Sequence, residues 1–110
     1  MAAIDRATFA ELQATAGADF VRELVDTFLE EAPPMLAELG DALASSRADA
    51  FRRAAHSLKS NASTFGALTL AAMARDLELQ GLGAATPAAL AALAAQYDAA
   101  AAELKALRDE

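Results

Sequence analysis

Apolar residues recur at steps of three and four along nearly the whole chain, and no stretch alternates apolar and polar residues as a half-buried strand would. Alanine, the best helix former among the amino acids, accounts for 33 of the 110 residues. Glycine and proline, which disfavour helix interiors, number only five and three. The chain is therefore predicted to be all-α.

Glycines, prolines and capping residues divide the chain into five predicted helices, over residues 5–16, 18–43, 48–64, 67–80 and 87–107. Asp5 and Thr86 are residue types that cap helix N-termini. Pro33 and Pro34 interrupt the second helix, which we expect to be one long helix kinked there; two consecutive helices are the alternative. The last segment carries the narrow apolar seam of a coiled coil, but the seam is too short to favour a free coiled coil.

Amphipathic helices with short connections bury their apolar faces most economically by packing against one another. We therefore expect an antiparallel, up-down four-helix bundle with a short additional N-terminal helix. No repeat or low-complexity linker divides the sequence, so residues 1–110 are expected to form a single domain.

Composition excludes several classes of function. The chain has no cysteine, so neither disulfides nor a thiolate zinc site are possible. Sixteen acidic residues against nine basic ones argue against nucleic acid as a partner. No stretch is long and apolar enough to suggest a membrane span, and the N-terminus lacks the features of a signal peptide. We expect a cytoplasmic protein; whether it is free-standing or a domain excised from a larger chain, such as a hybrid kinase, is left open.

The single histidine, His56, lies in the third predicted helix. A helical wheel places one apolar stripe toward the core, made of Ala48, Phe51, Ala55, Leu58, Ala62 and Phe65. His56 falls almost opposite the centre of that stripe, so its imidazole should be exposed. Arg52 lies one turn before it on the same face, Lys59 and Ser60 one turn after, and Ser63 two turns after. An idle surface histidine would leave these cations and small residues unexplained.

The neighbours of His56 discriminate between kinds of site. A helical metal site needs a second ligand three or four residues away, where this chain has cations and serine, so no metal is expected. A serine-protease-like triad lacks both a nearby acid and a nucleophile elbow. A phosphoryl group on the imidazole would add roughly two negative charges, which Arg52 and Lys59 are placed to offset. Small Ser60 and Ser63 leave room for another protein to approach the ring.

The stretch AHSLKSNASTFGA, residues 55–67, resembles the signature of histidine-containing phosphotransfer (HPt) domains, in which A-H-x-L-K is followed by small residues and a glycine ten positions after the histidine. Leu77-Glu78 is similar to an L-E pair of the next helix in that family, and Phe28 to Pro33 resembles its F-x-x-x-A-P-like segment. The resemblance covers about residues 4–107. One departure is Ser60, because glycine commonly follows the lysine in the family.

The resemblance implies roles for individual residues. His56 would be the phosphoacceptor and Lys59 the cation that stabilises the phosphoryl group. Glu78 would hydrogen-bond the imidazole and fix its orientation; an ordinary solvated glutamate is the alternative. The expected partner-docking residues are Arg52, Ser60, Ser63 and Gly66, where Gly66 would also be a point of close passage into the next helix.

The expected function is to carry a phosphoryl group on His56 between receiver-domain aspartates in a two-component phosphorelay. No nucleotide-binding loop exists, so the chain should be a phosphocarrier without autokinase activity. It would need no cofactor of its own, because the receiver brings Mg²⁺ by resemblance. The expected partners are response-regulator receiver domains or a hybrid sensor histidine kinase, and the chain is expected to be a monomer. The alternatives are a helical interaction module in which His56 is not phosphorylated, and a hydrolase with Glu78 as its second acid/base group.

Overall fold

The computed structural model describes residues 2–110, which form five α-helices and one short 3₁₀ helix, η1, without a strand among them. The elements in chain order are α1 (Arg6–Ala16), α2 (Ala18–Ala44), α3 (Ala48–Thr64), α4 (Leu68–Gln80), η1 (Leu82–Ala84) and α5 (Pro87–Arg108). The predicted all-α fold and its five helices are confirmed. No helix in the described part of the chain combines the length and the apolar character needed to cross a bilayer.

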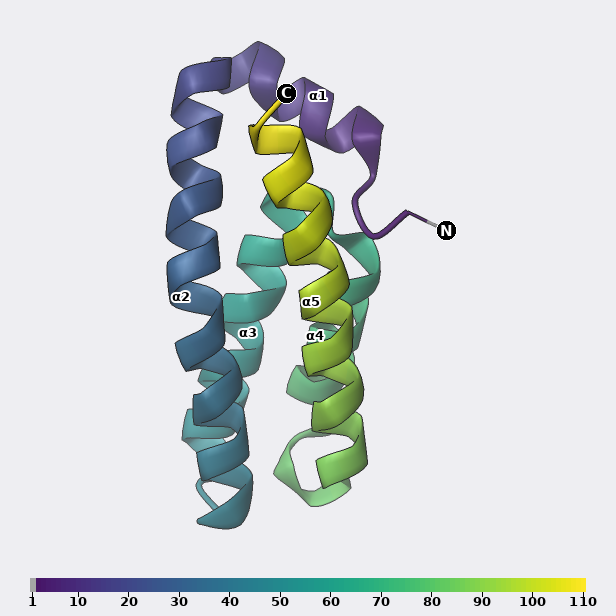
Figure 1. Cartoon of the computed structure of the whole chain (residues 1–110). Coiled ribbons are helices and arrows are strands. Elements are labelled where there is room, and N and C mark those ends of the chain that lie inside the picture. The colour runs from purple at the N-terminus through teal and green to yellow at the C-terminus, as the bar shows by residue number, and fades with distance from the viewer. Residues whose placement is uncertain (1) are drawn as a thin grey trace.

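The four long helices run alternately up and down as a bundle, with α1 lying across one end (Figure 1). In that view α2 and α5 form the front of the bundle, and α3 and α4 lie behind them. The tight connections between consecutive helices keep neighbours antiparallel, which is the up-down topology expected from the sequence.

Helix α2 continues through Pro33 and Pro34 without a break (Figure 1). Both prolines are exposed, so the backbone carbonyl groups that lose their helical N–H partners lie on the solvent side of the helix, where water can satisfy them. Val25, Phe28, Ala32 and Leu39 are buried on the opposite face. One long helix is therefore the correct interpretation, and the alternative of two consecutive helices is wrong.

Both predicted N-caps are present. The Asp5 carboxylate accepts a hydrogen bond from the backbone N–H of Thr8 at 3.2 Å, and the Thr86 hydroxyl accepts one from Ala89 at 3.1 Å. Pro87 follows Thr86 at the start of α5, where a missing N–H is not needed within the helix. These caps fix where the first and last helices begin.

Aromatic side chains connect the helices at the centre of the core. The Phe28 ring on α2 lies 5.3 Å from that of Phe65, at the end of α3, and 5.8 Å from that of Tyr97 on α5. The buried residues of α3 include the predicted stripe from Phe51 to Phe65 and also Ala50 and Ala54, which widen it. Ala48 is the exception. It is exposed because it lies in the first turn of α3, beyond the covered part of the bundle, so its assignment to the core was wrong.

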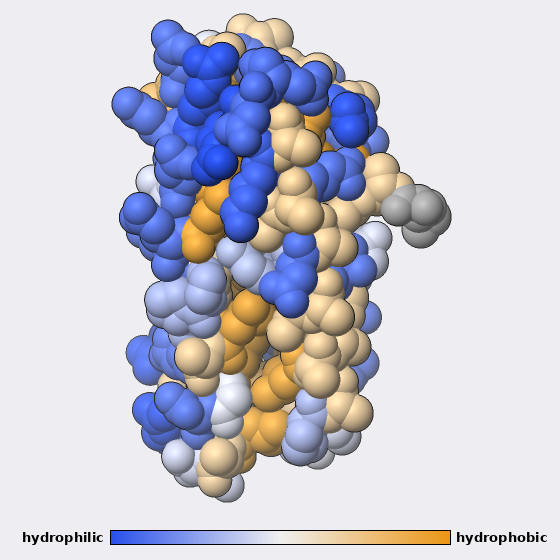
Figure 2. All heavy atoms as spheres, in the orientation of Figure 1, coloured by the Kyte–Doolittle hydropathy of each residue, from blue (hydrophilic) through white to orange (hydrophobic). Residues whose placement is uncertain are grey.

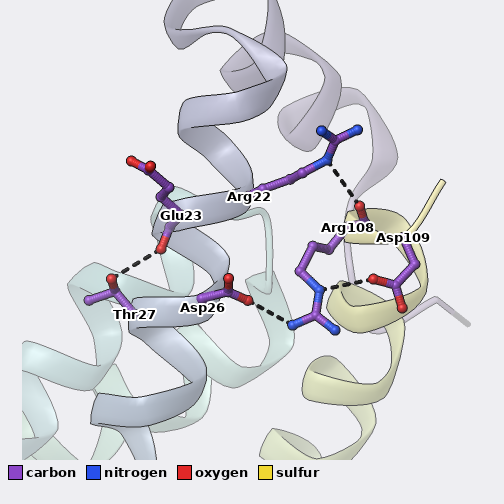
Figure 3. A network of polar contacts seen from close by, with 6 residues as sticks. All are labelled: Arg22, Glu23, Asp26, Thr27, Arg108 and Asp109. Atoms are coloured by element: carbon purple, nitrogen blue, oxygen red, sulfur yellow. Dashed lines mark hydrogen bonds and ion pairs between the residues drawn. The ribbon is translucent and has the colours of Figure 1, made fainter.

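Polar contacts attach the end of α5 to α2 (Figure 3). One guanidinium nitrogen of Arg108 lies 2.7 Å from the Asp26 carboxylate, and another lies 3.0 Å from Asp109. Arg22 donates a hydrogen bond to the Arg108 carbonyl oxygen at 3.3 Å. The contacts therefore satisfy a carbonyl group at the C-terminus of α5 that has no partner within the helix.

The face formed by α2 and α5 is chemically divided (Figure 2). Hydrophilic side chains cover the upper part of α2, whereas apolar atoms lie in the seam between the two helices in the lower half of the view. Leu29, Leu36 and Leu90 are half-buried residues of these helices that pack on the core. The six carboxylates of α2 beyond its first turn, Glu23, Asp26, Glu30, Glu31, Glu38 and Asp41, are all exposed.

Candidate functional site

Helix α3 directs the His56 imidazole outward. The side of α3 that faces the core is fixed by four fully buried residues, Phe51, Ala55, Leu58 and Ala62. The His56 side chain lies on the opposite side and is 57% exposed. Its predicted exposure is confirmed, because the burial of the apolar stripe leaves no other orientation for this helix.

A carboxylate from the neighbouring helix contacts the imidazole. Glu78 Oε2, on α4, lies 2.6 Å from His56 Nδ1, and Glu78 Oε1 lies 2.9 Å from the Lys59 ammonium nitrogen. The Glu78 side chain is 22% exposed and that of Lys59 is 29% exposed, so both are partly shielded from water. The antiparallel packing of α3 and α4 therefore brings together three of the residues singled out in the sequence.

The pKa of the Glu78 carboxyl lies below its usual value. The hydrogen bond from Lys59 is the largest cause; partial burial opposes it, and the contact with His56 lowers the pKa further. Glu78 is therefore ionised at neutral pH, and an ionised carboxylate can only accept hydrogen bonds. The hydrogen of a neutral His56 ring is consequently held on Nδ1, and the lone pair lies on Nε2. No group within residues 2–110 hydrogen-bonds to Nε2.

An open hollow of about 960 Å³ adjoins the imidazole. It extends from the N-terminal half of α3, at Arg52 and Arg53, to the C-terminal end of α4, at Leu79 and Gln80. The hollow is wide and shallow and has two arginines at one edge. It has room for the surface of another protein rather than the enclosure of a small-molecule pocket.

Arg52, Ser60 and Ser63 are exposed on the face that carries His56, as the helical wheel predicts. The Arg52 guanidinium lies 2.8 Å from the Asp49 carboxylate one turn earlier. This pair holds Arg52 at the edge of the hollow and offsets part of its charge. The short side chains of the two serines do not obstruct the approach of another protein to the imidazole.

Gly66 does not lie on that face. It is buried, and its backbone φ of +82° turns the chain between α3 and α4. Its carbonyl oxygen accepts a hydrogen bond from the Asp5 N–H at 2.7 Å, and a Cβ at this position would lie 2.8 Å from the Asp5 carbonyl oxygen and 2.9 Å from Thr8 Cβ. The assignment of Gly66 to partner docking was wrong, because the N-terminal segment covers it. Its role as a point of close passage into α4 agrees with its place in the turn.

A second hollow, of about 190 Å³, lies at the far end of the bundle among α1, α2 and the end of α5. Its floor is apolar, and Arg22 and Arg108 stand at its edge. Both guanidinium groups already make ion pairs, with Asp19 and with Asp26 and Asp109. Neither arginine is therefore a free cation for an anionic ligand, and the Glu110 carboxylate also lines this hollow. Over residues 2–110, no cluster of three or more potential metal-ligating side chains occurs either.

Sequence reasoning missed several residues that line the hollow, and Leu79 is the one large apolar side chain among them. Leu79 lines the hollow beside His56 and is 69% exposed, the highest value for any large apolar side chain in the described chain. The available signal was its position next to Glu78. Leu77 belongs to the buried stripe of α4, so a leucine two residues later must point away from the core.

The chain matches a known protein family and a solved structure. The model of the Hpt domain family matches residues 23–105. The chain is also similar to the crystal structure of histidine-containing phosphotransfer protein B (HptB) from Pseudomonas aeruginosa PAO1, with 28% sequence identity and a TM-score of 0.87. That similarity covers 96% of this chain and 94% of the other. Among curated proteins, no match was found.

Proposed function

The chain belongs to the Hpt domain family and has a histidine phosphotransfer function in phosphorelays, and we propose that His56 is the residue on which it carries the phosphoryl group. The observation that supports this assignment is the hydrogen bond between Glu78 and Nδ1. It leaves the other ring nitrogen, Nε2, with a lone pair on a side chain that is 57% exposed. His56 is also the only imidazole in the sequence.

In the proposed transfer, the Nε2 lone pair attacks the phosphorus of an aspartyl phosphate on a receiver domain. The Nε2–P bond forms while the bond between phosphorus and the aspartate oxygen breaks, and the aspartate leaves as a carboxylate. The hydrogen on Nδ1 stays in place, so the ring gains positive charge as the bond forms. The Glu78 carboxylate, 2.6 Å away, stabilises that charge. Transfer to the next receiver is the reverse of this step.

Two cations offset the charge of the phosphoryl group. Lys59 donates to Glu78 in the unphosphorylated chain, and its ammonium has two further hydrogens with which to meet phosphoryl oxygens. Arg52 acts over a longer range from the edge of the hollow. We propose that the receiver supplies Mg²⁺ for the reaction, since the transfer itself asks chiefly for in-line positioning and charge neutralisation.

Hpt domains are phosphocarriers that act with receiver domains and kinases of phosphorelays, and we propose that this chain has no catalytic turnover of its own. A hydrolase would need a group that activates water near the phosphorus. Both Glu78 oxygens are already engaged, by His56 and by Lys59, on the Nδ1 side of the ring. Glu78 is therefore not placed to activate water at a phosphoryl group on Nε2.

The direct test is to incubate the purified chain with a receiver domain phosphorylated by acetyl phosphate, and in parallel with phosphoramidate. Acid-labile, base-stable phosphoryl label is expected on the wild type and none on His56→Gln. The matched control is Lys105→Gln, which changes an exposed side chain on α5 without removing the nucleophile. Label that persists on His56→Gln would exclude the carrier assignment. Binding without label would favour an interaction module, and release of inorganic phosphate without stable label would favour a hydrolase.

A further inference from the structure

Helix α4 presents a line of exposed residues to solvent. Leu68, Ala72, Arg75 and Leu79 follow one another at steps of four, three and four, so they lie on one side of the helix, and we name this set the α4 stripe. Leu68 is 52% exposed and Leu79 is 69% exposed, whereas the core side of the helix buries other residues. The two leucines lie at opposite ends of the stripe, and Leu79 is at the end that lies beside His56.

The α4 stripe adjoins the phosphoacceptor. Glu78, which bonds the imidazole, is the residue before Leu79 in the chain, and Leu79 lines the same hollow as His56. Arg75 lies one turn before Glu78 on α4, on the part of the helix that runs alongside the C-terminal half of α3. A protein seated over Nε2 would therefore meet α4 as well as the small residues of α3.

The charges of the chain are distributed unevenly around this face. Residues 45–80 hold five of the nine cations and only three of the sixteen carboxylates, whereas residues 1–44 hold two cations and nine carboxylates. Arg53 and Arg75 make no ion pair among residues 2–110. The α3–α4 pair therefore carries an excess of cations on a protein that is acidic as a whole. The exposed residues of α2 carry an excess of carboxylates.

We propose that the receiver domain docks across α3 and α4, with carboxylates of its docking surface over Arg53 and Arg75 and an apolar side chain against Leu79. The proposal rests on the proposed function, which requires a receiver to bring its aspartyl phosphate to Nε2. Approach over α2 would set the negative phosphoryl end of that partner against carboxylates, whereas approach over α3 and α4 meets cations. The unpaired arginines then select among receivers, since charge complementarity determines encounter rate and excludes wrong partners.

The test uses the full chain and the receiver domains encoded in the genome that encodes it, each phosphorylated by acetyl phosphate. The receiver that transfers fastest to the wild type is then used with Leu79→Gln and Arg75→Glu. Each variant should raise the receiver concentration for half-maximal transfer by about fivefold or more, while the rate at saturation changes less. Transfer from the receiver should depend less steeply on salt concentration for Arg75→Glu than for the wild type, because a docking cation has been lost.

Matched controls keep the result specific. Phe20→Gln removes another large apolar side chain, 52% exposed, from the first turn of α2, and Lys105→Glu makes the same charge change on α5. Both controls should transfer within about twofold of the wild type, because surface substitutions away from an interface have little effect. Phosphoramidate needs no docking surface, so its reaction with His56 should be similar in all five proteins.

The outcomes separate failure of this inference from failure of the proposed function. If phosphoramidate labels His56 but Leu79→Gln and Arg75→Glu accept phosphoryl groups as the wild type does, the docking surface lies elsewhere and the inference is overturned. If a further variant, Ser60→Gln, is the only one that loses transfer from the receiver, the partner docks on α3 without α4 and the inference is also overturned. Sedimentation that reveals a dimer abolished by Leu79→Gln would assign the α4 stripe to a second copy of the chain. Absence of phosphoramidate label in the wild type would instead contradict the proposed function itself.

Discussion

Glu78 Oε2 accepts a hydrogen bond from His56 Nδ1 at 2.6 Å, and the two residues belong to different helices, α4 and α3. The orientation of the imidazole therefore depends on the packing of α4 against α3 and not on the histidine helix alone. The same carboxylate accepts from Lys59 at 2.9 Å, so a single side chain links the proposed nucleophile with the cation expected to stabilise the phosphoryl group.

Removal of the Glu78 carboxylate should slow phosphotransfer. Glu78→Ala loses a hydrogen bond to a ring that becomes charged during transfer, so the rate should fall by roughly 10- to 100-fold. Glu78→Gln keeps an oxygen that can accept from Nδ1, so its loss should be smaller. The measurement is the rate of label transfer from a saturating phosphorylated receiver. A Glu78→Ala rate equal to that of the wild type would show that the carboxylate does not position the ring.

Lys59→Ala should also slow transfer, because the phosphoryl group loses the cation that shares Glu78 with the imidazole. Lys59→Arg keeps the charge and should retain more of the rate, and Lys105→Ala on α5 is the control for loss of a distant lysine. The Lys59 ammonium makes a single ion pair, with Glu78, and that pair is only partly shielded, so the melting temperature of Lys59→Ala should change little. Equal transfer rates for Lys59→Ala and Lys105→Ala would remove Lys59 from the mechanism.

The lowered pKa of Glu78 gives a pH dependence of known sign. The folded chain holds the proton on this carboxyl less tightly than the unfolded chain, in which a glutamate has the usual pKa of 4.5. Its contribution to stability is therefore complete above the unfolded value and is lost as the pH falls through the lower folded value. The free energies of unfolding of the unphosphorylated wild type and Glu78→Gln should differ by a constant amount near neutrality and converge on acidification. A difference that widens below pH 4.5 would contradict the shift.

Much of this architecture could be predicted from the sequence because its determinants are local. Apolar spacing fixes the buried side of α3 and hence the exposure of His56, and Asp5 and Thr86 mark helix starts through their own side chains. Phe51 and Leu58 were assigned to the core on the same basis. Each of these features depends on residues within a turn or two of the chain.

The features that could not be predicted depend on packing between distant segments. The pairing of Glu78 with both His56 and Lys59 requires the register of α4 against α3, which no single helical wheel contains. Gly66 was placed on the docking face because the sequence does not show that the segment around Asp5 returns to cover it. The exposure of Ala48 likewise reflects where the bundle ends, which is a property of the assembled helices.

Leu58→Ala tests the orientation of α3. The Leu58 side chain is fully buried, so its truncation should destabilise the fold by about 2–5 kcal/mol through lost burial and the cavity that remains. Leu79→Ala makes the same chemical change at a 69% exposed position and should cost less than about 0.5 kcal/mol. Urea denaturation of both variants gives the comparison. Similar midpoints for the two would mean that α3 faces the core with another side.

Gly66→Ala and Gly81→Ala separate backbone strain from steric contact, because both glycines have a positive φ, of +82° and +74°. A Cβ at Gly81 would meet nothing within 4 Å, so Gly81→Ala should cost only backbone strain, about 1–3 kcal/mol, because φ of +74° with ψ of −175° is a conformation found essentially in glycine. A Cβ at Gly66 would lie 2.8 Å from the Asp5 carbonyl oxygen, so the N-terminal segment must move and the hydrogen bond from Asp5 to Gly66 is distorted. Gly66→Ala should therefore lose about 1–3 kcal/mol more than Gly81→Ala in denaturant unfolding. Phosphoramidate should still label the folded fraction of Gly66→Ala, since His56 and Glu78 do not contact this turn. Equal losses of stability in Gly66→Ala and Gly81→Ala would show that the N-terminal segment does not pack on Gly66.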